Sequence, residues 1–256
     1  MASRSEEAFW TEEDAQSLAE TTDVELLKRA WRNEKAAPEI LTFQANLVQR
    51  SREQIQLLTD HLCACLPACN HSMKLEIMKY LFLGHVWIYV NGVQEETVEE
   101  LSGNASDDLI ISLYQMDLDR TLFLLRSYLR VRLQKIEKYM LHISKTQLWN
   151  RLSEQEQKFA EKCTDIMEKH LQQSVLARLP YGYQSILKQS ISSEEDDMVP
   201  EPQLDTFIFC KSKGSVGAFQ LDDTGDEIVD LVADDLYVLR YKSIKGLVEG
   251  GQIDLV

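Results

Sequence analysis

The alternation of hydrophobic and polar positions divides the chain into a helical part and a strand-rich part. From about residue 22 to residue 176, apolar residues recur at intervals of three and four, which predicts amphipathic helices. Beyond residue 204 they recur at every second position in short runs, which predicts strands. We therefore expect an α+β fold that is mainly α, with an N-terminal helical bundle followed by a small β-rich C-terminal module.

Two helices are predicted before residue 63. The first begins after Thr22, whose side chain can cap it, with Glu25 three positions later as the reciprocal partner of a capping box. Pro38 ends this helix, because proline lacks a backbone donor and restricts the residue before it. The second helix runs from about residue 39 to residue 62, and Ile40 is the first of its apolar positions.

The strongest helical pattern covers residues 109–143. One row of apolar residues repeats along it at spacings of three and four: Leu118, Leu122, Leu125, Leu129, Leu133, Ile136, Met140 and Ile143. A second row lies beside the first: Leu124, Tyr128 and Val131. Two rows make the apolar arc wider than one neighbouring helix can cover, so this helix is expected to contact several neighbours.

A fourth helix is predicted from Ser153 to about residue 176, opened by a second capping box of Ser153 and Glu156. Its expected inward face consists of Phe159, Cys163, Ile166, Met167 and Leu171. After Pro180 a stretch rich in glycine, serine and acidic residues indicates a linker. The helical part is therefore expected to end near residue 180.

The predicted organisation has four parts: an acidic flexible tail (1–20), a helical domain (21–180, with an atypical insertion at 63–107), a linker (181–203) and a β-rich domain (204–256). The strand candidates in the last part are LDTFIFCK, VGAFQL, EIVDLV, DLYVLRY and QIDLV, with DDTG and EGG as turns between some of them. A module of about fifty residues is near the lower limit for independent stability, so we expect it to lean on another surface.

Composition and charge exclude several classes of protein. A formal net charge of -15 over 256 residues argues against a surface that grips DNA phosphates throughout. The five cysteines are an odd number and include a cluster of three, which indicates reduced thiols in the cytosol or nucleus. The longest apolar run, Tyr80–Val90, is too short for a bilayer, which needs about twenty residues. No phosphate loop or catalytic motif occurs, so no catalytic residue and no cofactor is predicted.

One cluster has the ligand types that suit zinc. Within HLCACLPACNH the candidates are His61, Cys63, Cys65, Cys69 and His71. Structural zinc sites usually join two ligand pairs separated by a longer span, and no second pair follows this cluster. A helix end with buried or half-exposed thiols is therefore the favoured interpretation, and a metal site is the weaker alternative.

The second half of the third helix is the most basic segment of this acidic chain. Five cations accompany a single acid there: Arg126, Arg130, Arg132, Lys135 and Lys138, with Glu137. Arg132 is expected at the edge of the leucine row. Arginines in that position commonly form interhelical or interface ion pairs, because the guanidinium fork binds carboxylates and its stem covers apolar area. The pattern favours a protein–protein seam, and an ordinary core helix with solvated charges stays open as the alternative.

Three blocks of sequence resemble those of the SLD-five subunit family of GINS, the tetrameric eukaryotic replication complex. They are AWRNEKAAPEIL (30–41), QMDLDRTLFLLRSYLRVRLQKIEKY (115–139) and LRYKSIKGLVEGGQIDLV (239–256). The resemblance covers about residues 22–62 and 108–256, with the blocks in the family's order. The family joins its second and third long helices by a shorter connection, so residues 63–107 depart from its pattern.

The resemblance implies a helical A domain, a linker, a small β-rich B domain and three related partner subunits. It also implies a nuclear, non-catalytic scaffold without a cofactor. Through GINS the chain would join the MCM ring and its companion subunit in the CMG replicative helicase, with indirect or weak contact to DNA and none to a membrane. Long helices of the family's A domains pack against one another between subunits, which would account for the double apolar row.

The interface residues expected from the helical pattern and the resemblance are Trp31, Asn33, Glu34, Lys35, Pro38, Leu122, Leu125, Arg126, Tyr128, Leu129, Arg130, Arg132, Leu133, Lys135, Ile136, Glu137, Lys138, Arg240 and Tyr241. The last two are expected in the final strand pair, where they would dock the β-rich domain on the helices or on a partner. Two alternatives stay open. One is a zinc-dependent nucleic-acid-binding protein that uses the His61–His71 cluster with the basic helix, and the other is a hydrolase whose site no motif reveals.

Overall fold

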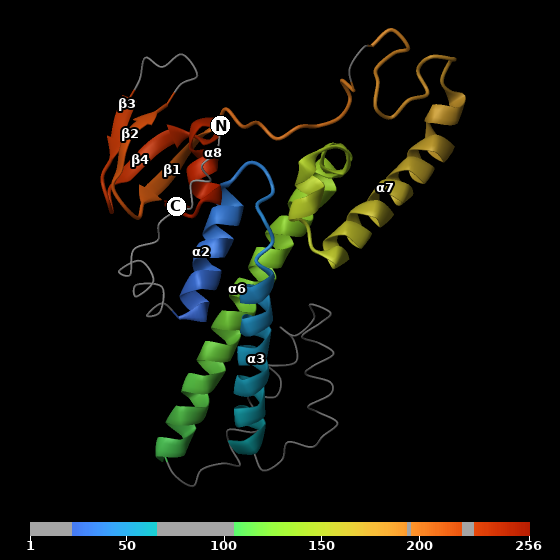
Figure 1. Cartoon of the computed structure of the whole chain (residues 1–256). Coiled ribbons are helices and arrows are strands. Elements are labelled where there is room, and N and C mark those ends of the chain that lie inside the picture. Colours follow the sequence, from blue (N-terminus) through green and yellow to red (C-terminus); the bar gives the residue numbers. More distant parts are fainter. Residues whose placement is uncertain (1–21, 66–104, 194–195, 222–227) are drawn as a thin grey trace, which may run out of the picture.

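The computed structural model describes residues 22–65, 105–193, 196–221 and 228–256. Its long helices are α2 (Asp23–Ala36), α3 (Ala45–Cys65), α6 (Ala105–Lys145) and α7 (Glu154–Ser174), followed by five short strands and one further helix (Figure 1). The mainly α, α+β fold class is therefore confirmed. Short 3-10 turns, Gln147–Arg151 and Leu176–Arg178, precede and follow α7.

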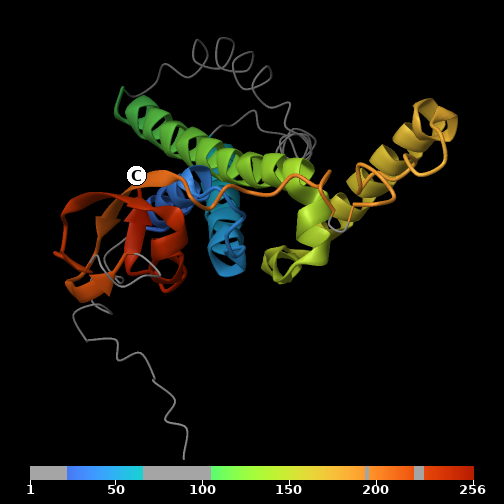
Figure 2. The same cartoon turned by 90° about the horizontal axis from the view of Figure 1, so that it is seen from above.

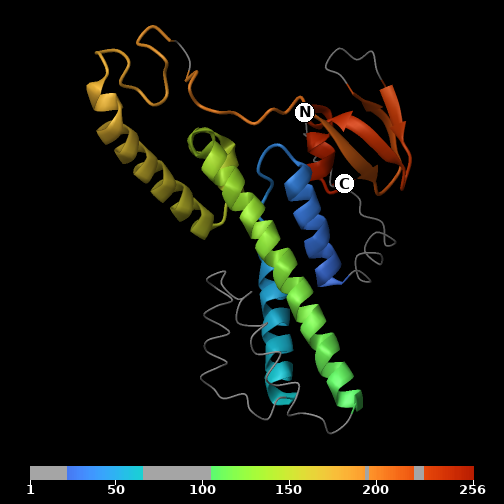
Figure 3. The same cartoon turned by 180° about the vertical axis from the view of Figure 1, so that it is seen from behind.

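Helices α2, α3 and α6 form the bundle, and α6 runs alongside the other two (Figures 1 and 3). The Thr22 side chain accepts a hydrogen bond from the Glu25 N–H, which is the first half of the predicted capping box; the reciprocal bond from the Thr22 N–H to the Glu25 side chain is not formed. Helix α2 ends two residues before Pro38. Apolar residues of all three helices share one core: Leu27, Leu47, Val48, Ile55, Leu122, Leu124, Leu125 and Tyr128. This core uses both apolar rows of α6. A single break in helical geometry, at Tyr139 (φ -117°, ψ 18°), bends the helix near its end.

Helix α3 begins at Ala45, so the predicted start near residue 39 is wrong. The chain between α2 and α3 is bound to other parts of the fold instead. The Phe43 N–H donates to the Arg151 carbonyl over 3.0 Å. Ile40, only 1% exposed, packs in a separate cluster with Ile136 and Ile143. Tertiary contacts thus override the local helical pattern of residues 39–44.

Helix α7 leaves the bundle, which corrects the prediction that it has a full inward face. Its first turn is anchored, because Ser153 and Glu156 form the predicted capping box. The buried residues of α7, Glu156 and Ala160, lie in its first two turns. Farther along the helix, Ile166 is 69% exposed. Figures 1 and 2 show the helix extending away from α2 and α3. Phe159, near the start of the predicted apolar stripe, packs against the cluster that contains Ile40 and Ile136, whereas Ile166 farther along the stripe is exposed.

The C-terminal module contains all five predicted strands: β1 (Phe207–Ser212), β2 (Val216–Gln220), β3 (Ile228–Leu231), β4 (Leu236–Arg240) and β5 (Ile253–Leu255). They form an antiparallel sheet of order β4-β1-β5 and a separate β2-β3 pair. The predicted DDTG turn lies outside the described residues. Helix α8 (Tyr241–Glu249) was not predicted. Arg240 ends β4 as expected, but Tyr241 opens α8, so its placement in a strand pair is wrong.

The β-rich module leans on the end of α2. Ala37 is buried in the module's own core, with Ile208, Cys210, Tyr241, Ile244 and Ile253. Ala36 and Leu41 pack against the same cluster. The turn after α2 therefore joins the two halves of the chain, and the polar groups that fix this joint lie around it.

Candidate interaction site

Arg132 is the centre of a buried polar network that joins α2, α6 and α7. Its Nε and Nη2 donate to the Glu156 carboxylate over 2.7 and 3.0 Å. Its Nη1 donates to Glu34 Oε2 over 2.9 Å and to the Leu41 carbonyl over 2.7 Å. The fifth donor reaches the Arg151 carbonyl over 3.2 Å. All five guanidinium N–H groups are thus satisfied, which is the condition for burying a charged arginine.

Aromatic rings cover the faces of this guanidinium. Its carbon lies 5.3 Å from the Phe43 ring centre and 5.7 Å from that of Tyr128. Burial on its own lowers the pKa of Arg132, but the hydrogen bond to Glu156 and the charge of Glu34 outweigh it and raise that pKa above its ordinary value. Burial also raises the pKa of Tyr128 to about 12. Arg132 is therefore positively charged, and Tyr128 uncharged, at neutral pH.

Lys135, one turn along α6, ties the same network to the end of α2. Its Nζ donates to Glu34 Oε1 over 2.9 Å and to the Glu39 carbonyl over 2.8 Å. It also donates to the Glu34 carbonyl. Burial lowers the pKa of Lys135, and the Glu34 carboxylate partly restores it. Two cations of α6 therefore hold the buried Glu34 carboxylate.

Two polar residues fasten the β-rich module to this centre. Asn33 Oδ1 accepts the Leu255 N–H over 2.8 Å, and Asn33 Nδ2 donates to Asp254 over 3.4 Å. These bonds cap the free edge of β5, the edge that does not pair with β1, with a side chain of α2. Helix α2 thus continues the hydrogen bonding of the sheet.

Glu39, only 2% exposed, is the second fastening point. Its carboxylate accepts from the Tyr241 hydroxyl over 3.1 Å, from Lys245 over 2.9 Å and from Arg151 over 3.2 Å. Arg151 also pairs with Glu249 of α8. Burial, followed by the charge of Glu39, raises the pKa of Tyr241. One carboxylate therefore joins α8 to the helical bundle.

The residues expected at an interface fall into three groups by exposure. The buried group is Glu34, Leu122, Leu125, Tyr128, Arg132, Ile136 and Tyr241. The half-buried group is Trp31, Asn33, Pro38, Arg126, Leu129 and Lys135. The exposed group is Lys35, Arg130, Leu133, Glu137, Lys138 and Arg240. The buried group is engaged within the chain, so a partner can reach only the other two.

Sequence reasoning did not identify Glu39, Arg151 or Lys245 as part of this network. Glu156 was identified as a capping residue, but not as the partner of Arg132. The capping role of Glu156 is visible in the sequence, but its pairing with Arg132 could be recognised only once the neighbouring helix was known. Pairing across 24 to 206 residues leaves no local pattern in the sequence.

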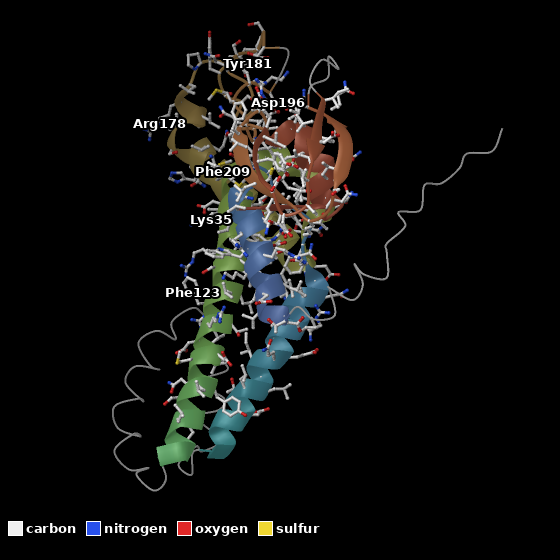
Figure 4. The ribbon with its side chains drawn as sticks, turned by 90° about the vertical axis from the view of Figure 1, so that its left-hand side faces the viewer. Lys35, Phe123, Arg178, Tyr181, Asp196 and Phe209 are labelled. Carbon is white, nitrogen blue, oxygen red and sulfur yellow. The ribbon has the colours of Figure 1, made fainter. Side chains whose placement is uncertain are left out.

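The outer face of α6 carries three residues of the predicted interface, Arg126, Arg130 and Leu133, beside three residues that were not predicted. We use this name for Met116, Arg120, Phe123, Arg126, Arg130 and Leu133. At about 100° per residue, Phe123 lies about 180° from the buried Arg132. Met116 is 67% exposed and Phe123 61% exposed. Figure 4 shows Phe123 on the same side of the molecule as Lys35 of α2.

A second apolar surface covers the outer side of the β4-β1-β5 sheet. It consists of Phe207, Phe209, Leu236, Val238 and Val256, each at least half exposed. The strand register places Phe209 opposite Val238. Lys211 and Arg240 stand at its two ends, and Asp234 and Asp205 neutralise them. Large exposed apolar patches usually mark contact surfaces of a protein.

The zinc candidates cannot be placed by this structure. The side chains of His61, Cys63 and Cys65 at the end of α3, and the whole of Cys69 and His71, lie outside the described residues. In the part of the chain that is described, no group of three or more His, Cys, Asp and Glu side chains could hold a metal ion. Within the same part, no helix combines the length and the apolar composition required to span a membrane.

Two family models match this chain, one for each half of the fold. The model for the GINS complex protein helical bundle domain matches residues 91–175, and its match begins inside the segment 63–107. The model for the C-terminus of the DNA replication complex GINS protein SLD5 matches residues 202–256. Together the matches define a GINS-type protein of a DNA replication complex.

Curated relatives give the particular family. The chain is 48% identical over 246 residues to the DNA replication complex GINS protein SLD5 of Arabidopsis thaliana, covering 95% of both chains. It is 31% identical to the SLD5 protein of Candida glabrata, over 91% of this chain and 78% of that one. With the human SLD5 protein the identity is 26%, over 91% and 88%. The chain belongs to the SLD5 family of GINS proteins, which confirms the resemblance seen in the sequence.

Proposed function

We propose that this chain is a non-catalytic subunit of a heterotetrameric GINS complex in the nucleus. As part of GINS it is a structural component of the CMG replicative helicase, needed for initiation and fork progression in DNA replication. Its direct partners are the three other GINS subunits, and through them it meets the MCM ring and the companion subunit of that ring. Its contact with DNA is indirect or weak. In this proposal residues 21–180 are the A domain, 181–203 the linker and 204–256 the B domain.

The observation that carries the proposal is the apolar surface that the described chain leaves open. Met116 and Phe123 stand exposed on the outer face of α6, and Ile166 stands exposed on α7. Phe207 and Phe209 are also exposed, on the sheet. Soluble monomers rarely expose contiguous apolar patches of this kind, because such patches promote association. Burial of these surfaces by other chains would explain why they are apolar, and the other GINS subunits are such chains.

The buried network serves this role by holding the surfaces in fixed relative positions. Glu34, Arg132 and Glu156 join three helices, and Glu39 joins α8 to them. A scaffold that meets several partners at once requires such rigidity, because misplacement of one surface weakens contact at the others. The interface residues proposed for contact with other subunits are therefore the half-buried and exposed groups of the predicted set.

Co-expression tests the proposal. The chain alone should be poorly soluble, and the chain with the three partner subunits should form a 1:1:1:1 particle. Size-exclusion chromatography with light scattering measures the mass of that particle. A soluble monomer that elutes apart from all three partners would contradict the proposal. A functional arm is depletion of the chain from a replication extract, which should stop DNA unwinding until the whole complex is added back.

A further inference from the structure

A serine-rich loop follows α7, and one carboxylate holds it closed. We call residues 187–198 the serine loop, of which 194–195 lie outside the described residues. The N–H of its last residue donates to the carbonyl of its first over 3.0 Å, so the chain turns back on itself. Asp197 bridges the inside of this turn, because its Oδ1 accepts the Gln189 N–H over 2.8 Å and its Oδ2 accepts the Ser193 hydroxyl over 3.2 Å. Figure 1 shows the loop in orange, after the end of α7.

Hydrogen bonds, and not packing, keep the Ser193 side chain in position. Its Oγ accepts the Ser190 N–H over 3.2 Å, and its carbonyl accepts from Lys188 Nζ over 3.2 Å. Ser193 is half-buried, and its neighbours Ser192 and Asp197 are exposed. None of the described residues of the loop belongs to a buried core cluster. The Ser193 hydroxyl therefore becomes accessible when a few surface hydrogen bonds break.

Four carboxylates follow this hydroxyl directly along the chain, because residues 193–197 have the sequence SEEDD. Kinases with a basic substrate groove recognise a serine by the acids after it, since complementary charge across an interface confers specificity. The third position after the serine contributes most to this recognition, and Asp196 occupies it. Asp196 pairs with Lys145 of α6 at the surface, where the two side chains are 35% and 42% exposed. The recognition acid is therefore open to solvent.

Other hydroxyls with an acid at the same spacing are engaged in helix caps. Ser153 caps α7, and Glu156, three positions later, is 6% exposed and paired with α6. Thr22 caps α2 by accepting the Glu25 N–H. A kinase binds its substrate segment in an extended form, so it would have to unwind the start of a helix to use either hydroxyl. At Ser193 it has only to open a surface loop.

We propose that Ser193 is a phosphorylation site for an acid-directed serine/threonine kinase, and that the phosphate opens the serine loop. In the reaction Ser193 Oγ attacks the γ-phosphorus of ATP. The Oγ–P bond forms, the bond from that phosphorus to the leaving oxygen of ADP breaks, and the hydroxyl proton passes to the base of the kinase. This inference goes beyond the proposed function, which assigns no modification to the chain.

The phosphate opens the loop because it reverses the contact that closes it. Phosphorylated Oγ has no proton to donate to Asp197, and the phosphate adds a charge of about -1.5 to -2 beside that carboxylate. Like charges at this separation repel each other. Lys188, which already donates to the Ser193 carbonyl, supplies a cation for the phosphate. Asp197 is thereby displaced, and the Gln189 N–H loses its acceptor.

Phosphorylation of the co-expressed complex by casein kinase II and ATP tests the inference. Mass spectrometry of the loop peptide measures the occupancy of Ser193 over time, and most chains should carry one phosphate there. Asp196→Asn/Asp197→Asn should lower the initial rate about tenfold or more, because it removes the charges that the kinase recognises. The matched control, Glu161→Gln/Glu168→Gln, removes two exposed acids of α7 and should be phosphorylated at the rate of the wild type.

Hydrogen exchange separates the modification from its effect on the loop. In the fully phosphorylated complex the Gln189 amide should exchange about tenfold faster than before, while the amides of β1 are unchanged. The Ser193→Ala complex, treated with the same kinase, should gain no phosphate on the loop and show no further change in exchange. Unchanged exchange at Gln189 with Ser193 fully phosphorylated would overturn the opening of the loop.

Three results would overturn the assignment of the site. They are phosphate on Ser192 in place of Ser193, equal rates for the two double variants, and a loop that gains no phosphate and is an acidic linker only. The chain purified from dividing cells should carry the same phosphate on Ser193, and its absence there also overturns the inference. The assay does not depend on assembly. If the three partner subunits do not bind, the proposed function fails, and the full chain alone still decides whether Ser193 is the site.

Discussion

Arg132 and Glu34 are 98 residues apart in the sequence, and their charged groups meet over 2.9 Å with the two side chains 0% and 1% exposed. The pair binds α6 to the last turn of α2. Glu156, bound to the same guanidinium, adds the start of α7. Burial of three charges is tolerated because every donor of the arginine has an acceptor. The network is therefore the main polar determinant of how the helices are arranged.

Replacing Arg132 by Met should destabilise this arrangement by about 3–5 kcal/mol, because it leaves the buried Glu156 carboxylate without its cation and leaves Glu34 with Lys135 alone. Met keeps the apolar stem of the arginine side chain, so the packing of that stem is largely kept. In the assembled complex, hydrogen exchange of the α2 and α6 amides should accelerate by about a hundredfold or more. Arg178→Met, at an exposed arginine, is the control and should change exchange little. Equal exchange in the two variants would refute the central role of Arg132.

The sequence predicted the chemistry of Arg132 but not its location. Its position at the edge of the leucine row, and the affinity of guanidinium for carboxylates, pointed to an ion pair between helices. Periodicity tells which face of a helix a residue occupies, but not which element covers that face. Here α2 and α7 of the same chain supply the carboxylates, from positions 98 and 24 residues away. The residues that stay open to a partner, such as Arg130, could be separated from Arg132 only with the fold known.

Replacing Asn33 by Ala should loosen the edge of the β-rich module. It removes the acceptor of the Leu255 N–H and the donor to Asp254, and the expected cost is about 1–2 kcal/mol. The Leu255 amide should exchange about tenfold faster, while amides of β2 are unchanged. Asn150→Ala, at an exposed asparagine in the 3-10 turn before α7, is the matched control. Unchanged exchange at Leu255 would show that the capping of β5 by α2 is not significant in solution.

The errors of the sequence analysis share one physical origin. Residues 39–44 have a helical pattern, yet Ile40 packs away from α3 and Phe43 bonds to Arg151. Tyr241 continues the alternation of β4, yet it opens a helix whose buried residues include Ile244 and Val248. The local pattern was sufficient for the five strands, whose alternation of apolar and polar residues distinguishes the two faces of the sheet, and for the capping box of Ser153, whose partner is three residues away. It failed where distant segments compete for the same residues.

Replacing Glu39 by Gln should weaken the joint between the two modules. The amide oxygen can still accept from Tyr241, but the charge that attracts Lys245 and Arg151 is lost, at an expected cost of about 1–3 kcal/mol. Hydrogen exchange in α8 should rise, and cleavage by a protease between residues 180 and 203 should become faster. Glu161→Gln on the exposed side of α7 is the control. Identical proteolysis of both variants and the wild type would exclude Glu39 as a fastening point.

The buried Tyr128 hydroxyl should make the chain lose stability at alkaline pH. In the folded chain the pKa of Tyr128 is about 12, above its ordinary value of 10.0. Below pH 10 the tyrosine is protonated in both the folded and the unfolded state, so its contribution to the free energy of unfolding is fully present. Between pH 10 and 12 the unfolded state loses the proton first, which favours unfolding by up to about 2–3 kcal/mol at the end of this range.

Tyr128→Phe removes this titration, and it provides the test. At pH 9 the variant should be about 1 kcal/mol less stable than the wild type, because the Gln44 N–H loses its acceptor. That difference should shrink and then reverse as the pH rises from 10 to 12. Urea unfolding followed by circular dichroism measures this difference in the free energy of unfolding. The titration of other alkaline groups, such as Tyr241, cancels in the difference because both proteins contain them. Tyr181→Phe, at a tyrosine that is 88% exposed, should show no such reversal. A constant difference between Tyr128→Phe and the wild type from pH 9 to 12 would mean that the Tyr128 hydroxyl is not buried in solution.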